Sequence, residues 1–412
     1  MASKTIFSSV IPTARDRAGN DPIFILNSEA TRRAAAGESI INATIGALMT
    51  DGGDLAVMPT VLDAFSQARS TRSAGYAPIS GLPAFRAAVL QSLFGEGALS
   101  KQATAVATPG GTGAIYQAVV NALEPGQNLL TSSYYWGPYR AITAHAGRGI
   151  ETFNMFGEDG AFDVEALASA MERQASTQGR VMVVLNFPCH NPTGYSLSPE
   201  EWSRVGDVVC RVGEKVPVTV LLDVAYMRYG GAAATSWVEA VQGMLRAATV
   251  LVAWTASKSF TQYGARIGAL VALHRDPGEL RQLENALGFT CRATWSNCNH
   301  VGQLAVTKLL TDGELIERSQ AERDGLLGLL QTRIDAFNDA ASSLGLSVPR
   351  YDSGFFVAAF TRDSEATARV MREGGVYVVP LEGAVRIALC CTPAAVISRL
   401  TTVLAQGVAA AG

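Results

Sequence analysis

The chain has 412 residues, which is long for a single hydrophobic core, so we expect two to three domains. Hydrophobic residues make up 48% of it and charged residues 17%, which indicates a globular protein and excludes a disordered one. The net charge of −3 comes without long runs of either sign, so we expect no nucleic-acid partner. The longest apolar runs are far shorter than the roughly 20 residues that cross a bilayer, and residues 1–13 do not resemble a secretory signal. We therefore expect a soluble cytoplasmic protein that binds no membrane.

The cysteines and histidines show no metal-binding pattern. None of the six cysteines belongs to a CxxC pair, and Cys189-His190 is the one close Cys–His pair, so we expect no metal site. Cys390 and Cys391 are adjacent in an expected strand, where their side chains would point to opposite faces. We expect no disulfide between them.

The middle of the chain alternates between short apolar runs and helical stretches. A helix is expected to begin at Ser198, with Ser198 as the N-cap and Pro199 in the first turn. The expected strands are apolar almost throughout, which is typical of strands buried on both faces of a mostly parallel sheet. They cover residues 104–108, 128–131, 181–185, 218–222, 250–254 and 267–273, with further helices at 112–123 and 138–147. We expect a doubly wound α/β domain over residues 55–320.

The two ends of the chain have a different pattern. A long amphipathic helix is expected over 315–344, followed by strand-like runs at 354–360, 376–379 and 385–389 and by helices at 364–373 and from Pro393. This predicts a smaller α+β domain formed by residues 321–412. Residues 1–54 have too little apolar surface to fold alone and are expected to pack on it.

Ligands of open α/β sheets bind beyond the carboxyl ends of the strands, so the residues that follow each strand matter most. Gly110, Gly111 and Thr112 follow the first strand and open a helix, where backbone N–H groups and a hydroxyl can hold a phosphate. The same residues also suit a simple tight turn. The segment is not a GxGxxG motif, which argues against a dinucleotide.

Three later strand ends carry further polar groups. Asn191-Pro192-Thr193-Gly194 follows one strand and could be only a loop, whereas Asp223 ends another strand and is costly to bury without a partner. Lys258 is the one lysine of five that follows a buried strand. Surface lysines are commoner, but a buried lysine with a lowered pKa forms Schiff bases. A phosphate cradle, an amine, a carboxylate and an Asn/Tyr pair together match pyridoxal phosphate.

With these motifs in order along the chain, the sequence resembles the fold type I, class I/II aminotransferases, closest to the aspartate and aromatic amino acid group. The resemblance covers nearly the whole chain, from Ile41 to the segment around Arg386. Each motif alone is weak, but their combination and order are specific. The motifs lie at residues 76–83, 110–113, 191–194, 223–226 and 255–258.

The resemblance implies a role for each matching residue. Lys258 is similar to the Schiff-base lysine that also moves the proton, and Asp223 to the partner of the pyridine nitrogen. Asn191 and Tyr226 resemble the pair that hydrogen-bonds the ring oxygen. Trp136 resembles the residue that stacks on the ring, although it could be a core tryptophan. The implied phosphate ligands are Gly111, Thr112, Thr255, Ser257, Arg266 and, from the neighbouring subunit of a homodimer, Tyr76.

The expected substrate contacts come from Gly46, Trp136, Asn191 and two arginines. Arg386 resembles the residue that grips the α-carboxylate as a planar fork, and Arg292 the residue that reaches across the dimer to a distal carboxylate. Either arginine could instead be structural or solvated. Four aromatic residues are expected to flank the pocket and favour aromatic donors, namely Tyr134, Tyr135, Tyr139 and Trp295. Two residues depart from the family pattern: Gly110 stands where the family often has Ser, and Asn186 where some members have His.

The resemblance implies transfer of an amino group from an aromatic or acidic L-amino acid to 2-oxoglutarate, by a ping-pong mechanism with pyridoxal 5′-phosphate. A β-lyase, a decarboxylase or a cyclising synthase on the same scaffold remains an alternative, since all would share Lys258, Asp223 and Arg386. A second alternative is a non-catalytic, aminotransferase-like ligand sensor for gene control. That sensor would require a helix-turn-helix module, for which we expect no room before the α/β domain.

Overall fold

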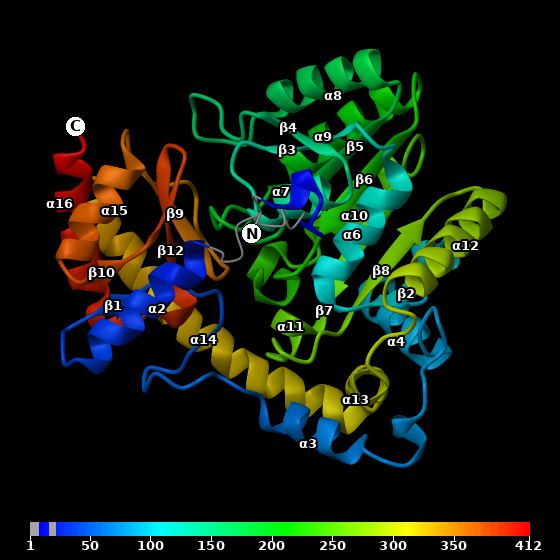
Figure 1. Ribbon diagram of the computed structural model, residues 1–412, viewed down its shortest axis with the longest axis horizontal. Coiled ribbons are helices and arrows are strands. Elements are labelled where there is room, and N and C mark those ends of the chain that lie inside the picture. The colour runs from blue at the N-terminus through cyan, green and yellow to red at the C-terminus, as the bar shows by residue number, and fades with distance from the viewer. Residues whose placement is uncertain (1–7, 16–21) are drawn as a thin grey trace, which may run out of the picture.

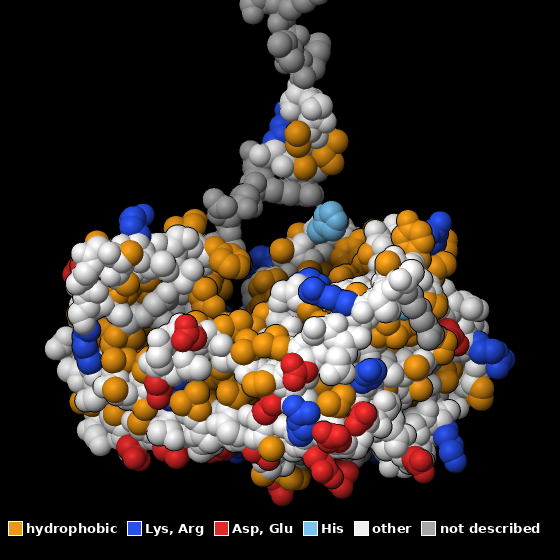
Figure 2. Space-filling view, turned by 90° about the horizontal axis from the view of Figure 1, so that it is seen from below, with side chains coloured by type: hydrophobic (Ala, Val, Ile, Leu, Met, Phe, Trp, Pro, Cys, Tyr) orange, Lys and Arg blue, Asp and Glu red, His pale blue; other side chains and the backbone are white. Residues whose placement is uncertain are grey.

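The computed structural model describes residues 8–15 and 22–412. Residues 1–7 and 16–21 of the expected N-terminal segment lie outside the described residues. Figure 1 shows a larger and a smaller lobe, joined by the long helix α14 (Gly313–Ser343). On the face shown in Figure 2, hydrophobic side chains gather in the hollow between the two lobes.

The larger lobe is built on a seven-stranded sheet in the order β2-β8-β7-β6-β5-β3-β4. Its strands pair in parallel except at β8, which is antiparallel to both β2 and β7. This confirms the expected mostly parallel, doubly wound α/β fold. The strands are β2 (Ala103–Thr108), β3 (Asn128–Ser132), β4 (Gly149–Phe153), β5 (Val181–Leu185), β6 (Val218–Asp223), β7 (Thr249–Thr255) and β8 (Gly268–Leu273).

Helices cover both faces of this sheet, which explains why its strands are apolar on both sides. One face packs on α6 (Gly110–Ala122), α7 (Pro138–His145) and α12 (Pro277–Thr294). The other face packs on α4 (Pro83–Phe94), α8 (Val164–Gln178), α9 (Pro199–Gly213), α10 (Ser236–Met244) and α13 (His300–Thr311). Shorter helices of this lobe are α3 (Pro59–Gln67), α5 (Ala98–Lys101) and α11 (Ala256–Ser259).

The smaller lobe combines residues from both ends of the chain. β1 (Ile41–Asn42) pairs in parallel with β10 (Val376–Tyr377), and a three-stranded antiparallel sheet has the order β11-β12-β9. Its strands are β9 (Phe356–Phe360), β11 (Val379–Leu381) and β12 (Ala384–Ala388), with helices α2 (Pro22–Ala35), α15 (Ser364–Glu373) and α16 (Ile397–Ala410) around them. A short helix, α1 (Pro12–Arg15), lies nearer the N-terminus.

Helix α14 runs without interruption through the expected domain boundary at 320/321. It has 31 residues, about 46 Å at 1.5 Å per residue. Near its start Leu315 packs on the core of the larger lobe, whereas Leu330, Ile334 and Phe337 belong to the core of the smaller one. The boundaries at 54/55 and 320/321 therefore remain a prediction, and the second of them falls within a helix instead of a linker.

The structure corrects the expectation that Cys390 and Cys391 lie in a strand. β12 ends at Ala388, opposite the first residue of β9, and the two cysteines form a 3-10 turn, η4 (Leu389–Cys391). Their thiols donate to the carbonyls of Ile45 and Asn42, respectively. All six cysteines are free.

Within residues 8–15 and 22–412, no helix is long and apolar enough to span a membrane. The same ranges contain no group of three or more His, Cys, Asp or Glu side chains that could hold a metal ion.

Candidate active site

A cavity of about 390 Å³ opens at the carboxyl ends of the strands, where the two lobes meet. This size is within the usual range for small-molecule sites. Ten of the expected site residues line the cavity: Gly111, Thr112, Trp136, Asn191, Asp223, Tyr226, Thr255, Ser257, Lys258 and Arg266. The motifs that are separated by up to 155 positions in the sequence are thus brought together.

Asp223 ends β6 and is 5% exposed. Its Oδ2 accepts a 2.7 Å hydrogen bond from the hydroxyl of Tyr139, and its Oδ1 a 3.3 Å bond from the backbone N–H of Ala225. Burial raises the pKa of Asp223 to about 6, against the effect of these two donors. A cation at this carboxylate would favour its ionised form.

Asn191 and Tyr226 lie beside Asp223. The amide of Asn191 donates to the hydroxyl of Tyr226 over 3.4 Å, and its Oδ1 is buried without a partner in the described part of the chain. Asn186 bridges two strand ends, because its amide donates to the carbonyl of Asp223 and accepts from the N–H of Asn191. Asn186, which departs from the family pattern, is therefore a neutral side chain that holds Asp223 and Asn191 in place relative to one another.

Lys258 extends from α11 toward three aromatic rings. Its Nζ lies 4.5 Å from the ring centre of Tyr263 and 5.6 Å from those of Tyr226 and Phe355. The amine also donates to the carbonyl of Gly46 over 2.5 Å. Burial, with a smaller contribution from the nearby charges of Arg266 and Arg386, lowers the pKa of Lys258 to about 8. A substantial fraction of the amine is therefore neutral near pH 8 and able to act as a nucleophile.

Hydroxyl groups and a cation gather at one end of the cavity. Arg266 donates 3.1 Å to the hydroxyl of Ser257, and the hydroxyl of Thr255 donates to the same oxygen over 3.0 Å. The N-terminus of α6 contributes Gly111 and Thr112. Gly110 has φ +72, and a Cβ there would lie 2.3 Å from Arg266, so glycine at this position lets the guanidinium approach the helix. This combination suits a doubly charged anion.

The expected carboxylate-binding arginine is buried in the smaller lobe. Arg386 lies in β12, where its guanidinium stacks 4.6 Å from the ring centre of Phe356 and donates to the carbonyl of Thr44. Its charge lowers the pKa of Lys258 and of Tyr226, two residues that line the cavity. Gly46 lies close to the same ring, since a Cβ there would be 2.5 Å from Phe356.

Two expected residues lie away from the cavity of their own chain. Tyr76 is 91% exposed, and Arg292 is exposed on α12 with its guanidinium donating to Ser296. Neither residue lines the cavity.

The expected aromatic flank does not form part of the cavity wall. None of its four residues lines the cavity: Tyr139 is buried against Asp223, Tyr134 packs on Phe156 and Phe360, and Trp295 lines a separate surface pocket near Arg266. The aromatic residues that do line it, besides Trp136 and Tyr226, are Tyr263 and Phe24. Sequence reasoning missed Tyr263. The only sign that it belongs to the site was its position in the sequence between Lys258 and Arg266.

The fold and the site define an enzyme of the aminotransferase type, and the comparisons agree. The profile of the family described as aminotransferase class I and II matches residues 38–404. An aromatic-amino-acid aminotransferase of Pseudomonas aeruginosa is 33% identical over 68% of this chain and 70% of its own length. An aspartate aminotransferase of the same organism is 28% identical over 91% of this chain and 93% of its own.

Solved structures show the same similarity. An aminotransferase from Anaerococcus prevotii superposes with a TM-score of 0.90 at 31% identity, over 98% of this chain and 100% of that chain. An aromatic-amino-acid aminotransferase from Burkholderia pseudomallei, described as covalently bound to pyridoxal phosphate, has a TM-score of 0.80 at 24% identity, over 96% of this chain and 98% of that one. This chain belongs to the class I and II aminotransferases, which confirms the resemblance seen in the sequence.

Proposed function

We propose that this aminotransferase uses pyridoxal 5′-phosphate to transfer the amino group of an aromatic or acidic L-amino acid to 2-oxoglutarate, by a ping-pong mechanism. One observation carries the proposal: a buried carboxylate, an Asn/Tyr pair, an amine of lowered pKa and an anion-binding end converge on one cavity. The named aromatic and aspartate aminotransferases among the relatives support this choice of donors.

The residues present fit this cofactor. The anion-binding end, with Arg266, Thr255 and Ser257, suits the phosphate. Asp223 lies at another wall of the cavity, where it would hold a protonated ring nitrogen, and the partnerless Oδ1 of Asn191 is a buried polar atom that a ligand could satisfy. Trp136 would cover one face of the ring. When bound, the cofactor supplies an electron-accepting ring to the reaction.

The chain's own residues would bind the substrate and move the proton. Arg386 would hold the α-carboxylate with its planar fork, which orients the Cα–H bond toward Lys258. The neutral amine of Lys258 would accept that proton and return it at the other carbon, as a general acid–base must. Tyr226 and Asn191 would hold the ring oxygen and so keep the ring in register with Lys258.

We further propose a homodimer as the active form and a cytoplasmic location. Tyr76 and Arg292 are both exposed and are expected to enter the site of the neighbouring subunit, Tyr76 at the phosphate and Arg292 at a distal carboxylate. The six free cysteines support a reducing compartment.

A half-reaction tests the function. The purified protein is loaded with pyridoxal phosphate and mixed with phenylalanine, tyrosine or aspartate in the absence of an acceptor. We expect a stoichiometric 2-oxo acid and the pyridoxamine form of the cofactor, which 2-oxoglutarate then reverses. Release of ammonia, carbon dioxide or a cyclised product instead would favour a lyase, a decarboxylase or a cyclising synthase.

A further inference from the structure

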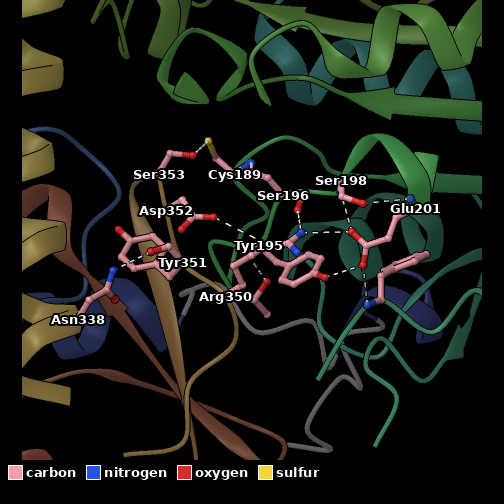
Figure 3. A network of polar contacts seen from close by, with 12 residues as sticks. Cys189, Tyr195, Ser196, Ser198, Glu201, Asn338, Arg350, Tyr351, Asp352 and Ser353 are labelled. Carbon is pink, nitrogen blue, oxygen red and sulfur yellow. Dashed lines mark hydrogen bonds and ion pairs between the residues drawn. The ribbon is translucent and has the colours of Figure 1, made fainter. Parts of the chain in front are cut away.

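A buried carboxylate on the larger lobe gathers four hydrogen-bond donors (Figure 3). Glu201, in the first turn of α9, accepts at Oε1 from the hydroxyl of Tyr195 over 2.6 Å and from the N–H of Phe162 over 3.0 Å. Its Oε2 accepts from the N–H of Ser198 over 2.7 Å and from the guanidinium of Arg350 over 3.2 Å. Tyr195 thus ties the end of the Asn191 loop to the start of α9, and Phe162 adds the segment that precedes α8.

The fourth donor comes from the other lobe. Arg350 lies in the segment between α14 and β9, and its guanidinium stacks 4.5 Å from the ring centre of Tyr195. The same nitrogen that reaches Glu201 donates 2.6 Å to the carbonyl of Ser196, while Asp352 approaches the Nε to 3.8 Å. Arg350 is therefore a contact between the lobes, made to a carboxylate that is already held in place.

Close backbone packing accompanies this contact. Gly194 has φ +78, and a Cβ there would lie 2.3 Å from both the carbonyl of Phe356 and the ring of Tyr351. From the other side, a Cβ on Gly354 would lie 2.6 Å from Cys189, whose thiol contacts Ser353 at 3.4 Å. The loop 186–196 and the segment 350–356 thus fit against each other with no room for a side chain between them.

Both partners of this contact lead directly to the cavity. Asn191 lies three positions before Gly194 in one of them. The other continues into β9, which pairs with β12 so that Ala358 lies opposite Arg386. A shift of Arg350 relative to Glu201 would therefore change the position of Arg386 relative to Asn191.

We propose that Arg350 and Glu201 are positioning residues: together with Tyr195 they form an interlobe clasp that sets the distance between the carboxylate-binding arginine of the smaller lobe and the Asn191 loop of the larger. This inference rests on the proposed function, because it assigns the substrate's α-carboxylate to Arg386. Neither residue touches the cavity, so the clasp acts only through the two segments that it joins.

The substitutions follow from the geometry. Arg350→Met removes the charge but keeps a flexible stem over the ring of Tyr195, and Glu201 retains its three other donors. Glu201→Gln places an N–H₂ group against at least one N–H donor in either orientation of its amide, so it should be the more harmful change. Arg204→Met is the matched control. Like Glu201, Arg204 lies on α9, and like Arg350 it pairs with a carboxylate, but its partner Glu165, at 3.3 Å, belongs to the same lobe.

Steady-state kinetics of the holoenzyme provide the first readout. For Arg350→Met we expect KM for both the amino donor and the 2-oxo acid to rise about three- to tenfold while kcat stays within about twofold, because the hydrogen bonds to Glu201 and to the carbonyl of Ser196 are both lost. In the double variant with Glu201→Gln, the rise in KM should not exceed that of Glu201→Gln alone by more than about twofold. Arg204→Met should leave KM unchanged. Unaltered KM in Arg350→Met, or an equal change in Arg204→Met, would overturn the clasp.

Amide hydrogen exchange provides a readout that does not depend on turnover. In the holoenzyme, Arg350→Met should speed exchange in residues 186–196 and 350–360 while α8 and α12 stay as in the wild type. Exchange that rises uniformly over the chain would show that Arg350 only stabilises the fold. Exchange that does not rise at all would show that the contact makes no contribution, and either result would refute the proposal. If the wild type itself transaminates no donor, the proposed function fails, and the exchange pattern still decides whether the clasp exists.

Discussion

The hydroxyl of Tyr139 donates a 2.7 Å hydrogen bond to Oδ2 of Asp223, and both side chains are buried beneath the cavity. Burial keeps the pKa of Tyr139 well above its usual value, so the phenol remains a neutral donor over the working pH range. The same burial raises the pKa of Asp223 to about 6. Tyr139 is therefore the neutral group that opposes the protonation of a buried acid.

The first prediction concerns this hydrogen bond. Tyr139→Phe should raise the pKa of Asp223 further, so that less of the carboxylate is ionised near pH 6 to 7. Binding of pyridoxal phosphate to the apo chain should then weaken by about tenfold at pH 6 and less at pH 8, as the loss of a bond to a charged group implies. Titrations across pH 5 to 8 measure this. Tyr135→Phe is the control, since its exposed hydroxyl accepts from Arg140; a pH-independent loss in Tyr139→Phe would contradict the prediction.

The second prediction concerns the stability of the apo chain. Because the pKa of Asp223 is higher in the folded chain than the usual 3.8, the native state keeps the proton where the unfolded state has lost it. Asp223 should therefore destabilise the apo chain increasingly between pH 4 and 6, by at most about 3 kcal/mol. Urea unfolding of Asp223→Asn should show this fall removed relative to wild type, while cofactor binding and turnover of the holoenzyme decrease. Stability curves of wild type and variant that run parallel with pH would contradict the raised pKa of Asp223. Near-native turnover of the variant would place the ring-nitrogen contact elsewhere.

The third prediction concerns Lys258. Lys258→Ala should still fold and bind pyridoxal phosphate non-covalently, but it should lose transamination by several orders of magnitude, because one amine supplies both the covalent link and the proton transfer. Borohydride reduction followed by peptide mapping checks the link, which should be found on Lys258 in the wild type and be absent in the variant. A reducible link at another lysine would refute the assignment.

The fourth prediction concerns the exposed Arg292. If it reaches a distal carboxylate in the other subunit, Arg292→Leu should lose use of aspartate and 2-oxoglutarate by about ten- to a hundredfold, as a charge-assisted pair of about 1.5–3 kcal/mol implies. Turnover of phenylalanine and tyrosine should stay within a few-fold when measured with a monocarboxylic acceptor. An equal loss for every donor would show that Arg292 is structural.

The sequence predicts the parts of this fold that are buried on both faces. β5 begins and ends where expected, because all five of its side chains are buried between two layers of helices. β4 was missed: it is the edge strand, only Phe153 in it is buried, and its sequence mixes polar and apolar residues. The expected strand at Cys390 and Cys391 was also wrong. The antiparallel pairing of β12 ends at Ala388, because its partner there, Phe356, is the first residue of β9.

The site was predictable where a motif fixes both the residue and its place after a strand, as at Asp223 and Lys258. It was not predictable where a contact joins two elements distant in the sequence. Tyr139 is such a case, since an aromatic residue near Trp136 suits a pocket wall as well as a buried hydrogen bond to a strand that ends 84 positions later. The contact of Arg350 with Glu201 likewise depends on the docking of two lobes, which no local pattern encodes.

The pairing of β1 with β10 also constrains how the protein is made. Arg33 hydrogen-bonds the hydroxyl of Tyr377, 344 positions further along the chain, and at about 5–20 residues per second a ribosome needs about 20–70 s to make that stretch. Ile41 likewise pairs with Val376, and the backbone of Ala43 hydrogen-bonds that of Tyr377 and Ala388, all in the last quarter of the chain. During synthesis these residues must therefore wait for partners that the ribosome makes much later.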